Sequence, residues 1–276
     1  MPEYKLGVST LSKTPFSHTE QLQYIKNAGF DAFFTMWTPA ETEQIANQAA
    51  RLGLYQQSIH APFSKAHLMW EDGDVGNDAT KELIDCVKDC ARFDIPIMVV
   101  HTFKGFKDHS PNETGITNFG RVVDAADKHG VKVAFENIEG EEYLFAVMDR
   151  YLDADHVGFC YDTGHQLCYN PNTDMLEKYG HKLIHTHIND NLGVRGDEIT
   201  WHDDLHLMPT DGIVDWGKVI KRIKELGYKD ILMSELCYAE REGKNGAIHR
   251  YNDLPMDEYM ALAYKKITAA IAAADK

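Results

Sequence analysis

Residues 131–137 read VKVAFEN, an apolar and β-rich run that ends in Glu136. The same pattern returns along the chain, with acidic or imidazole side chains at the end of QQSIHAP (56–62), IMVVHT (97–102), GFCYDTGH (158–165), LIHTHIND (183–190) and ILMSEL (231–236). If these runs are neighbouring parallel strands, their carboxyl ends converge on one point. A ring of carboxylates and imidazoles at that point predicts a divalent metal site.

Eight strands are predicted from such runs. They are Tyr4–Ser9, Ala32–Met36, Tyr55–His60, Ile97–His101, Val131–Glu136, Val157–Asp162, Leu183–His187 and Ile231–Glu235. Helical periodicity between them predicts helices at Ser17–Ala28, Pro39–Leu52, Asn77–Phe93, Asn118–His129, Glu141–Leu152, Asp174–Tyr179, Asp215–Leu226 and Met256–Ala274. No Pro/Gly/Ser-rich linker divides the chain, so we expect one α/β domain over residues 1–276, a (β/α)8 TIM barrel.

Length and composition suit this expectation. The chain has 276 residues, 43% of them hydrophobic, and a net charge of −15. An acidic surface without a basic stripe disfavours nucleic-acid binding. The first ten residues show no signal peptide and no apolar run reaches membrane-spanning length, so we expect a soluble cytoplasmic protein without a membrane partner. Five cysteines without a Cys-x-x-Cys pair favour neither a disulfide framework nor a thiolate zinc knuckle.

Four residues from the last four strands form the centre of the predicted site: Glu136, Asp162, His187 and Glu235. Three carboxylates and one imidazole suit Mn²⁺, Mg²⁺, Co²⁺ or Zn²⁺. Strand alternation places Glu136 on one face with Ala134, and large apolar neighbours on the other. We therefore expect small and polar side chains to point into the barrel and large apolar ones to lie under the helices.

Further candidates surround this centre. In Asp-Thr-Gly-His, His165 follows Asp162 by three residues, and Gly164 is expected to give the turn its backbone freedom. Asp204 and His206 are two apart and can face one way in an extended segment. His60 and His101 end their strands and are candidates for substrate binding or for further metal ions. His185 is interpreted as a barrel-core histidine or as one that supports a ligand.

Two connections, Ile188–Val214 and Leu236–Leu254, are long and polar, with Trp201, His202, Asp203, Tyr238 and Arg241 among their residues. Structureless stretches of this length are usually functional, so we expect them to cover the barrel mouth. Four aromatic side chains, Trp37, Phe63, Trp70 and Trp201, are candidates for a pocket wall, although core packing is expected for at least two of them.

The motifs IHAP, VAFEN, YDTGH, HTHIND, DLHLMPTDGIVDW and MSEL resemble those of the xylose isomerase-like TIM-barrel superfamily. This superfamily includes sugar and sugar-phosphate isomerases and epimerases as well as endonuclease IV-type enzymes. By resemblance to the ketose 3-epimerases, Glu136, Asp162, His187 and Glu235 would hold one metal ion, the two glutamates would move the substrate proton, and His165 would touch the substrate. By resemblance to the endonucleases, nine residues would hold three zinc ions: His60, His101, Glu136, Asp162, His165, His187, Asp204, His206 and Glu235.

Two positions depart from the family pattern. Gly193 stands where ketose 3-epimerases carry a substrate-binding arginine, which disfavours a ketose 3-epimerase substrate. The usual Pro-Gly-x-Gly has become Pro209-Thr210-Asp211-Gly212.

We therefore expect a divalent-metal-dependent isomerase or epimerase of a small polyhydroxy carbonyl compound. Its catalytic residues would be Glu136 and Glu235, its substrate-binding residues His60, His101 and His165, and its cofactor one metal ion, or up to three. The alternatives are an endonuclease IV-like zinc phosphodiesterase and a metal-dependent dehydratase or lyase. A non-enzymatic binding module has no need of two glutamates facing a metal. Oligomers are common among such barrels, so a homo-oligomer is compatible with the resemblance.

Overall fold

A ring of parallel strands forms the centre of the computed structural model, which describes residues 4–107, 110–238, 241–243, 246–248 and 251–275. The order in the eight-stranded sheet is β7-β6-β5-β4-β3-β2-β1-β8. The strands are β1 (Leu6–Ser9), β2 (Ala32–Met36), β3 (Tyr55–His60), β4 (Ile97–Val100), β5 (Lys132–Glu136), β6 (Val157–Asp162), β7 (Leu183–His187) and β8 (Leu232–Ser234). The predicted α/β barrel is confirmed.

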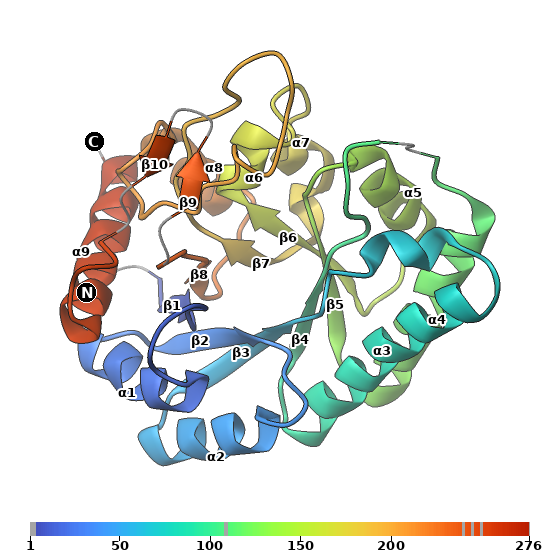
Figure 1. Ribbon diagram of the computed structural model, residues 1–276, viewed down its shortest axis with the longest axis horizontal. Helices are drawn as coiled ribbons and strands as arrows, with labels where there is room; N and C mark the ends of the chain where they lie inside the picture. The colour runs from blue at the N-terminus through green and yellow to red at the C-terminus, as the bar shows by residue number, and fades with distance from the viewer. Residues whose placement is uncertain (1–3, 108–109, 239–240, 244–245, 249–250, 276) are drawn as a thin grey trace.

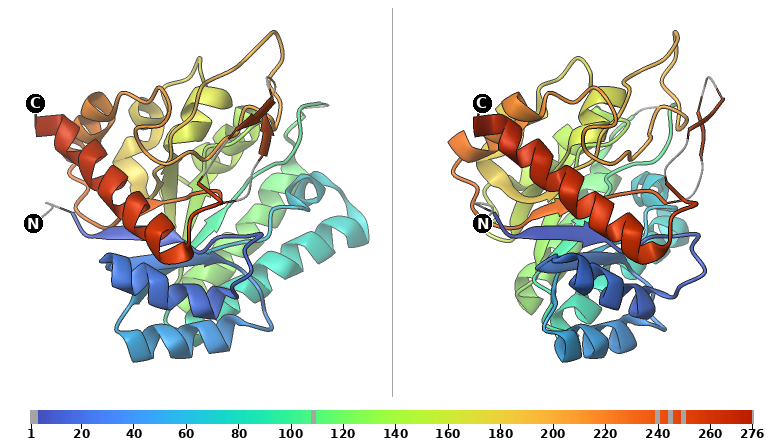
Figure 2. Two further views of the ribbon diagram at one scale, coloured as in Figure 1. Left: turned by 60° about the vertical axis from the view of Figure 1, so that its left-hand side comes forward. Right: turned by 90° about the vertical axis from the view of Figure 1, so that its left-hand side faces the viewer.

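Helices surround the strands, as Figures 1 and 2 show. They are α1 (His18–Ala28), α2 (Thr42–Leu52), α3 (Gly73–Arg92), α4 (Glu113–His129), α5 (Glu141–Tyr151), α6 (Thr163–Cys168), α7 (Met175–Tyr179), α8 (Trp216–Glu225) and α9 (Met256–Ala272), with 3-10 turns η1 (Ala66–Trp70), η2 (Gly180–Lys182) and η3 (Ala273–Asp275). The last helix, α9, packs beside α1, so the end of the chain closes the outer layer next to its beginning.

Side chains alternate between the barrel interior and the helix layer. Ala134 packs in an inner cluster with Ile97, Val99 and Cys160, whereas Phe135 belongs to the main core outside the strands. The face predicted for Glu136 is therefore the inner one. The expectation that large apolar side chains avoid the interior was wrong in part, because Phe34 and Met233 fill it with Ala32 and Ile231.

The seam between β7 and β8 is built differently from the other strand pairs. The two strands meet through a parallel bridge between Ile188 and Ser234, with Ile188 N–H donating to the Met233 carbonyl at 2.8 Å. The hydroxyl of Thr186 accepts from Met233 N–H at 2.9 Å and lies 3.2 Å from the Met233 carbonyl oxygen. One side chain thus takes the place of a stretch of backbone ladder.

Most element boundaries differ from the predicted ones by one to four residues, which is normal for helix and strand ends. Helix α4 begins at Glu113 rather than Asn118, because Asn112 caps it by accepting from Gly115 N–H at 3.0 Å. Helix α6 was not predicted. The turn expected at Asp162–His165 is its first turn, so Gly164 is helical and its predicted role as a flexible turn residue was wrong.

The long connection at residues 188–214 has no helix, as expected, and Asp190 organises it. The buried Asp190 carboxylate accepts from the N–H groups of Asn191, Thr210 and Val214 and from Trp216 Nε1, all at 2.9–3.0 Å. Thr210 has φ 79°, in the left-handed region that favours the glycine of the family pattern. A Cβ at Gly212 would lie 2.3 Å from Asp190 Oδ1, so this second glycine of the pattern is needed for space.

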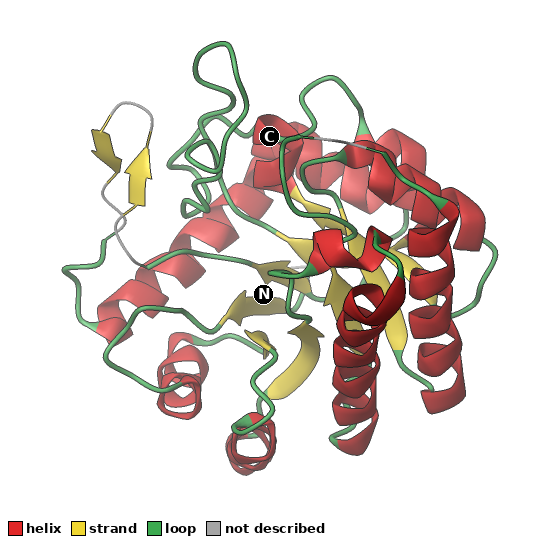
Figure 3. Cartoon of the chain, turned by 45° about the vertical axis from the view of Figure 1, so that its right-hand side comes forward, coloured by secondary structure: helices red, strands yellow, loops and turns green. Residues whose placement is uncertain are grey.

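The connection at 236–254 was expected to lack structure, and this was wrong. It contains an antiparallel pair, β9 (Arg241–Gly243) and β10 (Gly246–Ile248), which stands away from the barrel in Figure 3. The side chain of Arg241 lies outside the described part of the chain. Among the described residues, no helix has both the length and the apolar character that crossing a membrane requires.

Candidate active site

The nine residues singled out in the sequence lie together at the carboxyl ends of the strands. Register explains part of this, because Asp162 pairs with His187 and Glu136 with Cys160 across adjacent strands. A cavity of about 560 Å³ opens above them. Six of the nine line it, namely His60, His101, His165, Asp204, His206 and Glu235, while Glu136, Asp162 and His187 lie fully buried beneath.

Glu136 is at the centre of this cluster. Its Oε1 lies 2.8 Å from His187 Nδ1 and 3.4 Å from His165 Nδ1. Its Oε2 lies 3.3 Å from His60 Nε2 and 3.1 Å from His101 Nε2. Four imidazoles from different strand ends therefore converge on one buried carboxylate.

The second glutamate faces the first across His187. Glu235 Oε2 lies 3.1 Å from the same His187 Nδ1 that contacts Glu136. With Asp162, these residues form a group whose potential ligand atoms all lie within 4.8 Å of one another. It has the composition of the metal site predicted from the sequence.

Asp162 is held by residues that the sequence reasoning missed. Its Oδ1 accepts from His165 N–H at 2.7 Å and so caps α6, while its Oδ2 accepts from Asn189 Nδ2 at 2.7 Å. A Cβ at Gly164 would lie 2.0 Å from Asn189 Oδ1, so this glycine leaves room for the amide. Asn137 Oδ1 accepts from Asp162 N–H at 2.8 Å. Asn137 follows Glu136 in VAFEN, and Asn189 lies two residues after His187 in HTHIND. This closeness to candidate ligands is the signal that could have identified both asparagines.

Two histidines have a fixed tautomer. Nδ1 of His60 lies 2.8 Å from the Ala61 carbonyl oxygen, and Nδ1 of His165 lies 2.9 Å from that of Asn137. Because a carbonyl only accepts, each Nδ1 carries a proton. Nε2 of each ring faces a carboxylate of the cluster, so it binds either a second proton or an ion. Nε2 of His60 then faces a carboxylate oxygen of Glu136 at 3.3 Å. Two acceptors in contact require a cation between them, either a proton or a metal ion, so the donor set fits a divalent ion.

Two further groups of potential metal ligands lie beside the group of Glu136, Asp162, His187 and Glu235. His60, His101 and Glu136 form one, and His165, Asp204 and His206 form the other. In the second, His206 Nε2 lies 3.0 Å from Asp204 Oδ1. His206 has φ 46°, a left-handed conformation that is uncommon for a residue with a side chain and is often found at functional sites.

Burial and mutual contact shift the proton affinities of the cluster. Burial raises the pKa of Asp162 to about 6, against the opposing effect of His165 and His206. Burial opposes charge on His206, but Asp204 and Glu235 raise its pKa to about 9. Burial likewise opposes charge on Glu136, yet His187 and His101 hold its pKa well below the usual range. The shifts are therefore of both signs among the imidazoles, because burial lowers the pKa of His101 while carboxylates raise that of His206.

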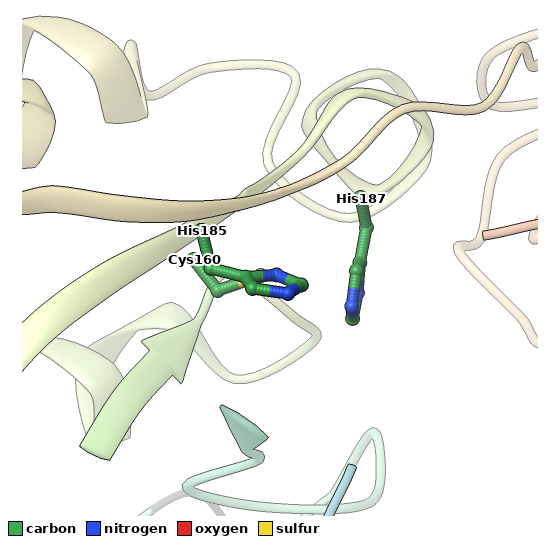
Figure 4. A group of neighbouring side chains, drawn as sticks. All are labelled: Cys160, His185 and His187. Carbon is green, nitrogen blue, oxygen red and sulfur yellow. The ribbon is translucent and has the colours of Figure 1, made fainter. Parts of the chain in front are cut away.

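Below His187 lies a smaller group that Figure 4 shows, made of Cys160, His185 and His187. Cys160 Sγ lies 3.5 Å from His185 Nδ1, and His185 Nε2 lies 2.8 Å from Ser58 Oγ. Burial raises the pKa of the Cys160 thiol to about 12 and lowers that of His185 well below its usual value. Cys160 and His185 are accordingly a neutral hydrogen-bonded pair beneath His187, which agrees with the interpretation of His185 from the sequence.

The pocket wall differs from the aromatic set named in the sequence. Phe63 and Trp201 line the cavity. Trp70 is 5% exposed and donates to the Thr102 carbonyl, and Trp37 Nε1 donates to Asp89, so both pack within the fold. Trp70 also lines a neighbouring cavity. Phe34 lies flat against His187, with ring centroids 4.7 Å apart and planes 16° apart.

Known proteins match most of the chain. The family model described as xylose isomerase-like TIM barrel matches residues 22–252. A protein of Methanocaldococcus jannaschii, MJ1311, is 25% identical over 260 residues, which cover 84% of each chain. An inosose dehydratase of Serratia proteamaculans is 27% identical over 134 residues, or 42% of this chain and 45% of that protein.

Solved structures share the fold at lower identity. A D-tagatose 3-epimerase-like protein superposes with a TM-score of 0.75 at 19% identity, covering 98% of both chains. The IOLI protein, solved with a bound zinc atom, superposes with a TM-score of 0.73 at 17% identity, covering 97% of this chain and 98% of its own.

Proposed function

The chain belongs to the xylose isomerase-like TIM-barrel family, and from this premise we propose that it is a divalent-metal-dependent isomerase or epimerase. Its substrate would be a small polyhydroxy carbonyl compound. Family membership supports an enzyme, and the zinc atom in the IOLI structure supports a metal site in this fold.

One observation carries the proposal. Glu136 and Glu235 approach the same nitrogen of His187, at 2.8 and 3.1 Å, from different strands. Two carboxylates that face each other across a ligand group at the floor of a cavity can act on a substrate carbon from two sides. A residue pair needed only for stability does not require a cavity above it.

The ion and the protein side chains would contribute different parts of the chemistry. A bound divalent ion supplies positive charge that lowers the cost of negative charge on the substrate oxygens. Glu136 and Glu235 would exchange the substrate proton, one removing it and the other returning it. His165 and His60 hold Nδ1 on backbone carbonyls and turn Nε2 to the cluster, where it can bind the ion or a substrate hydroxyl group. Asp162 and His187 would complete the metal site, with Asn189 orienting Asp162.

Gly193 bears on the substrate. It has φ 70° and no side chain to hold a substrate from its loop, whereas the ketose 3-epimerases have an arginine at the matching position. We therefore place recognition of the substrate on other walls of the cavity.

Proton exchange with solvent tests the proposal. The metal-reconstituted protein is incubated in heavy water with ketoses, aldoses, inososes and their phosphates, and deuterium at the carbon beside the carbonyl is followed by NMR. We expect incorporation with at least one of them, and at least about a 100-fold loss in Glu136→Gln or Glu235→Gln. Glu43→Gln, on the exposed face of α2, serves as the control and should behave as wild type. Activity that survives either active-site change contradicts the mechanism.

A second candidate is a zinc phosphodiesterase on abasic DNA. The two additional groups, around His101 and around His206, favour it because together with the first group they could hold up to three ions. The net charge of −15 opposes binding to a nucleic-acid backbone. Metal content per chain separates the two, since two or three zinc ions would favour the phosphodiesterase. The inosose dehydratase similarity supports a dehydratase as a further variant of the same metal chemistry.

A further inference from the structure

A second cavity lies beside the candidate active site. Its volume is about 650 Å³, against about 560 Å³ for the first. Its walls include Trp70, Phe103, Phe106 and Tyr143, and it shares Lys104 and Trp201 with the reaction cavity. These two shared residues stand at the junction, so one molecule can extend past them from one cavity into the other.

Trp201 has the features of a recognition residue. It is 51% exposed, although it is the largest kind of apolar side chain. Its Nε1 donates to Glu139 Oε1 at 3.4 Å, and its ring lies 5.2 Å from that of Phe106. An exposed indole held in place by its own N–H offers an apolar face at low entropic cost.

Polar groups surround this aromatic face. Nζ of Lys104 lies 5.1 Å from the Phe63 ring centroid and 5.7 Å from that of Trp201, which fixes the ammonium over the junction. Glu139 is 7% exposed, lines the reaction cavity and accepts from Gly105 N–H at 3.1 Å. An apolar face bordered by a cation and a carboxylate suits a ring that carries hydroxyl groups.

We propose that the substrate carries a second sugar ring, and that Lys104, Glu139 and Trp201 bind this ring at the junction. The reacting polyhydroxy carbonyl unit lies over Glu136, and the second ring packs its apolar face on the indole while its hydroxyls reach the ammonium and the carboxylate. The substrate class is therefore a glycosyl-substituted carbonyl sugar rather than a free monosaccharide. This inference rests on the proposed function, since the carbonyl unit is placed at the candidate active site.

An anionic substituent fits less well. Lys104 would attract it, but the buried Glu139 on the same wall would repel it. A free monosaccharide would leave the exposed indole and the second cavity without an occupant.

Calorimetric binding with matched ligands tests the proposal. The manganese-loaded protein is titrated with D-fructose, with D-fructose 6-phosphate, and with the glucosyl-fructoses turanose, maltulose, leucrose and isomaltulose, which differ in linkage. We expect at least one glucosyl-fructose to bind at least about 10-fold more tightly than fructose. Trp201→Ala should remove that advantage, and Trp201→Phe should retain most of it. Tyr55→Ala removes an aromatic side chain that is 49% exposed at the opposite end of β3, and it should change nothing.

Equal affinity for fructose and all glucosyl-fructoses would overturn the inference, as would an advantage that survives Trp201→Ala. A preference for the phosphate alone would overturn it in favour of an anion site at Lys104. The deuterium exchange described above separates this result from the proposed function. Exchange on free monosaccharides without a glucosyl preference would leave the function standing and remove only the second-ring site. A glucosyl preference without exchange would leave the second-ring site standing and contradict the proposed function.

Discussion

The sulfur of Cys160 lies 3.5 Å from Nδ1 of His185, one layer below the candidate ligand His187 (Figure 4). His187 turns Nδ1 to the two glutamates, and its buried Nε2 has no hydrogen-bond partner among the described residues. The ring of His185 packs edge to face against that of His187, with centroids 5.1 Å apart, so the pair helps to hold the position of the His187 ring. Groups of this kind tune metal ligands without touching the ion.

Loss of the Cys160 sulfur should weaken metal binding. We expect Cys160→Ala to reduce zinc affinity about 10-fold or more, while Cys160→Ser, which keeps a hydrogen-bonding group, retains most of it. Competition with a fluorescent chelator measures the affinity. Cys90→Ala, an equally buried cysteine on α3, is the matched control. Equal weakening in both alanine variants would mean that packing, not hydrogen bonding, explains the effect.

Metal removal should lower thermal stability. Glu136 and Asp162 are buried acids within one group, and an ion would balance their charge. At an ion concentration of about 100 times Kd, binding adds about 2.7 kcal/mol, which corresponds to roughly 5 °C in Tm for a chain of this length. Calorimetry with chelator, and then with manganese or zinc restored, measures the shift. Glu235→Gln should respond less than wild type, and a Tm that ignores the chelator would argue against a resident metal.

The hydroxyl of Thr186 should stabilise the β7–β8 seam. Thr186→Val keeps the volume but leaves the buried N–H of Met233 without its acceptor, at a cost of about 1–3 kcal/mol. Thr186→Ser keeps the hydroxyl and should cost less. Urea unfolding gives both free energies. If the serine variant were the less stable of the two, packing of the methyl group would be the larger effect.

Asp174 should contribute stability that depends on pH. It caps α7 by accepting from Glu177 N–H at 3.0 Å, and it accepts from Arg222 at 2.7 Å. Partial burial raises the pKa of this carboxyl. The hydrogen bonds from Arg222 and Glu177 lower it by more, so the net pKa is below its usual 3.8. A lowered folded-state pKa gives stability that is present above the unfolded value and is lost as pH falls through the folded one.

We therefore expect Asp174→Ala to lose about 1 kcal/mol near neutral pH and clearly less at about pH 3. Thermal unfolding at the two pH values measures the difference. Asp155→Ala, at an exposed position, should have little effect at either pH. A loss for Asp174→Ala that is equal at both would assign the effect to something other than the charge.

The sequence was sufficient to predict the barrel and the set of residues that lie together at its mouth. Strand β5 shows why, because its alternation fixes the inner face of Glu136 and its length fixes where that side chain lies. Barrel closure then brings Glu136 to the ends of the other strands. Alternation and strand length are local in sequence, and the barrel topology is enough to bring the strand ends together.

Contacts between distant segments could not be predicted in the same way. The meeting of Lys104 and Trp201 depends on the path of two loops, and no periodicity encodes it. Helix α6 was missed because Asp162 looks like the last residue of a strand and is at the same time a helix cap. The support that Asn189 gives to Asp162 depends on space left by Gly164, which appears only in three dimensions.

The seam between β7 and β8 has a consequence for the life of the protein in a cell. His187 ends β7 and Glu235 follows β8, so an ion held by both would cross the joint that has a single bridge and one hydroxyl. Metal loading and closure of the ring would then be one event. A chain that has not acquired its ion would open most readily at this joint, exposing the inner apolar side chains Phe34 and Met233 to proteases. On the proposed function, quality control would in this way remove chains that lack the ion.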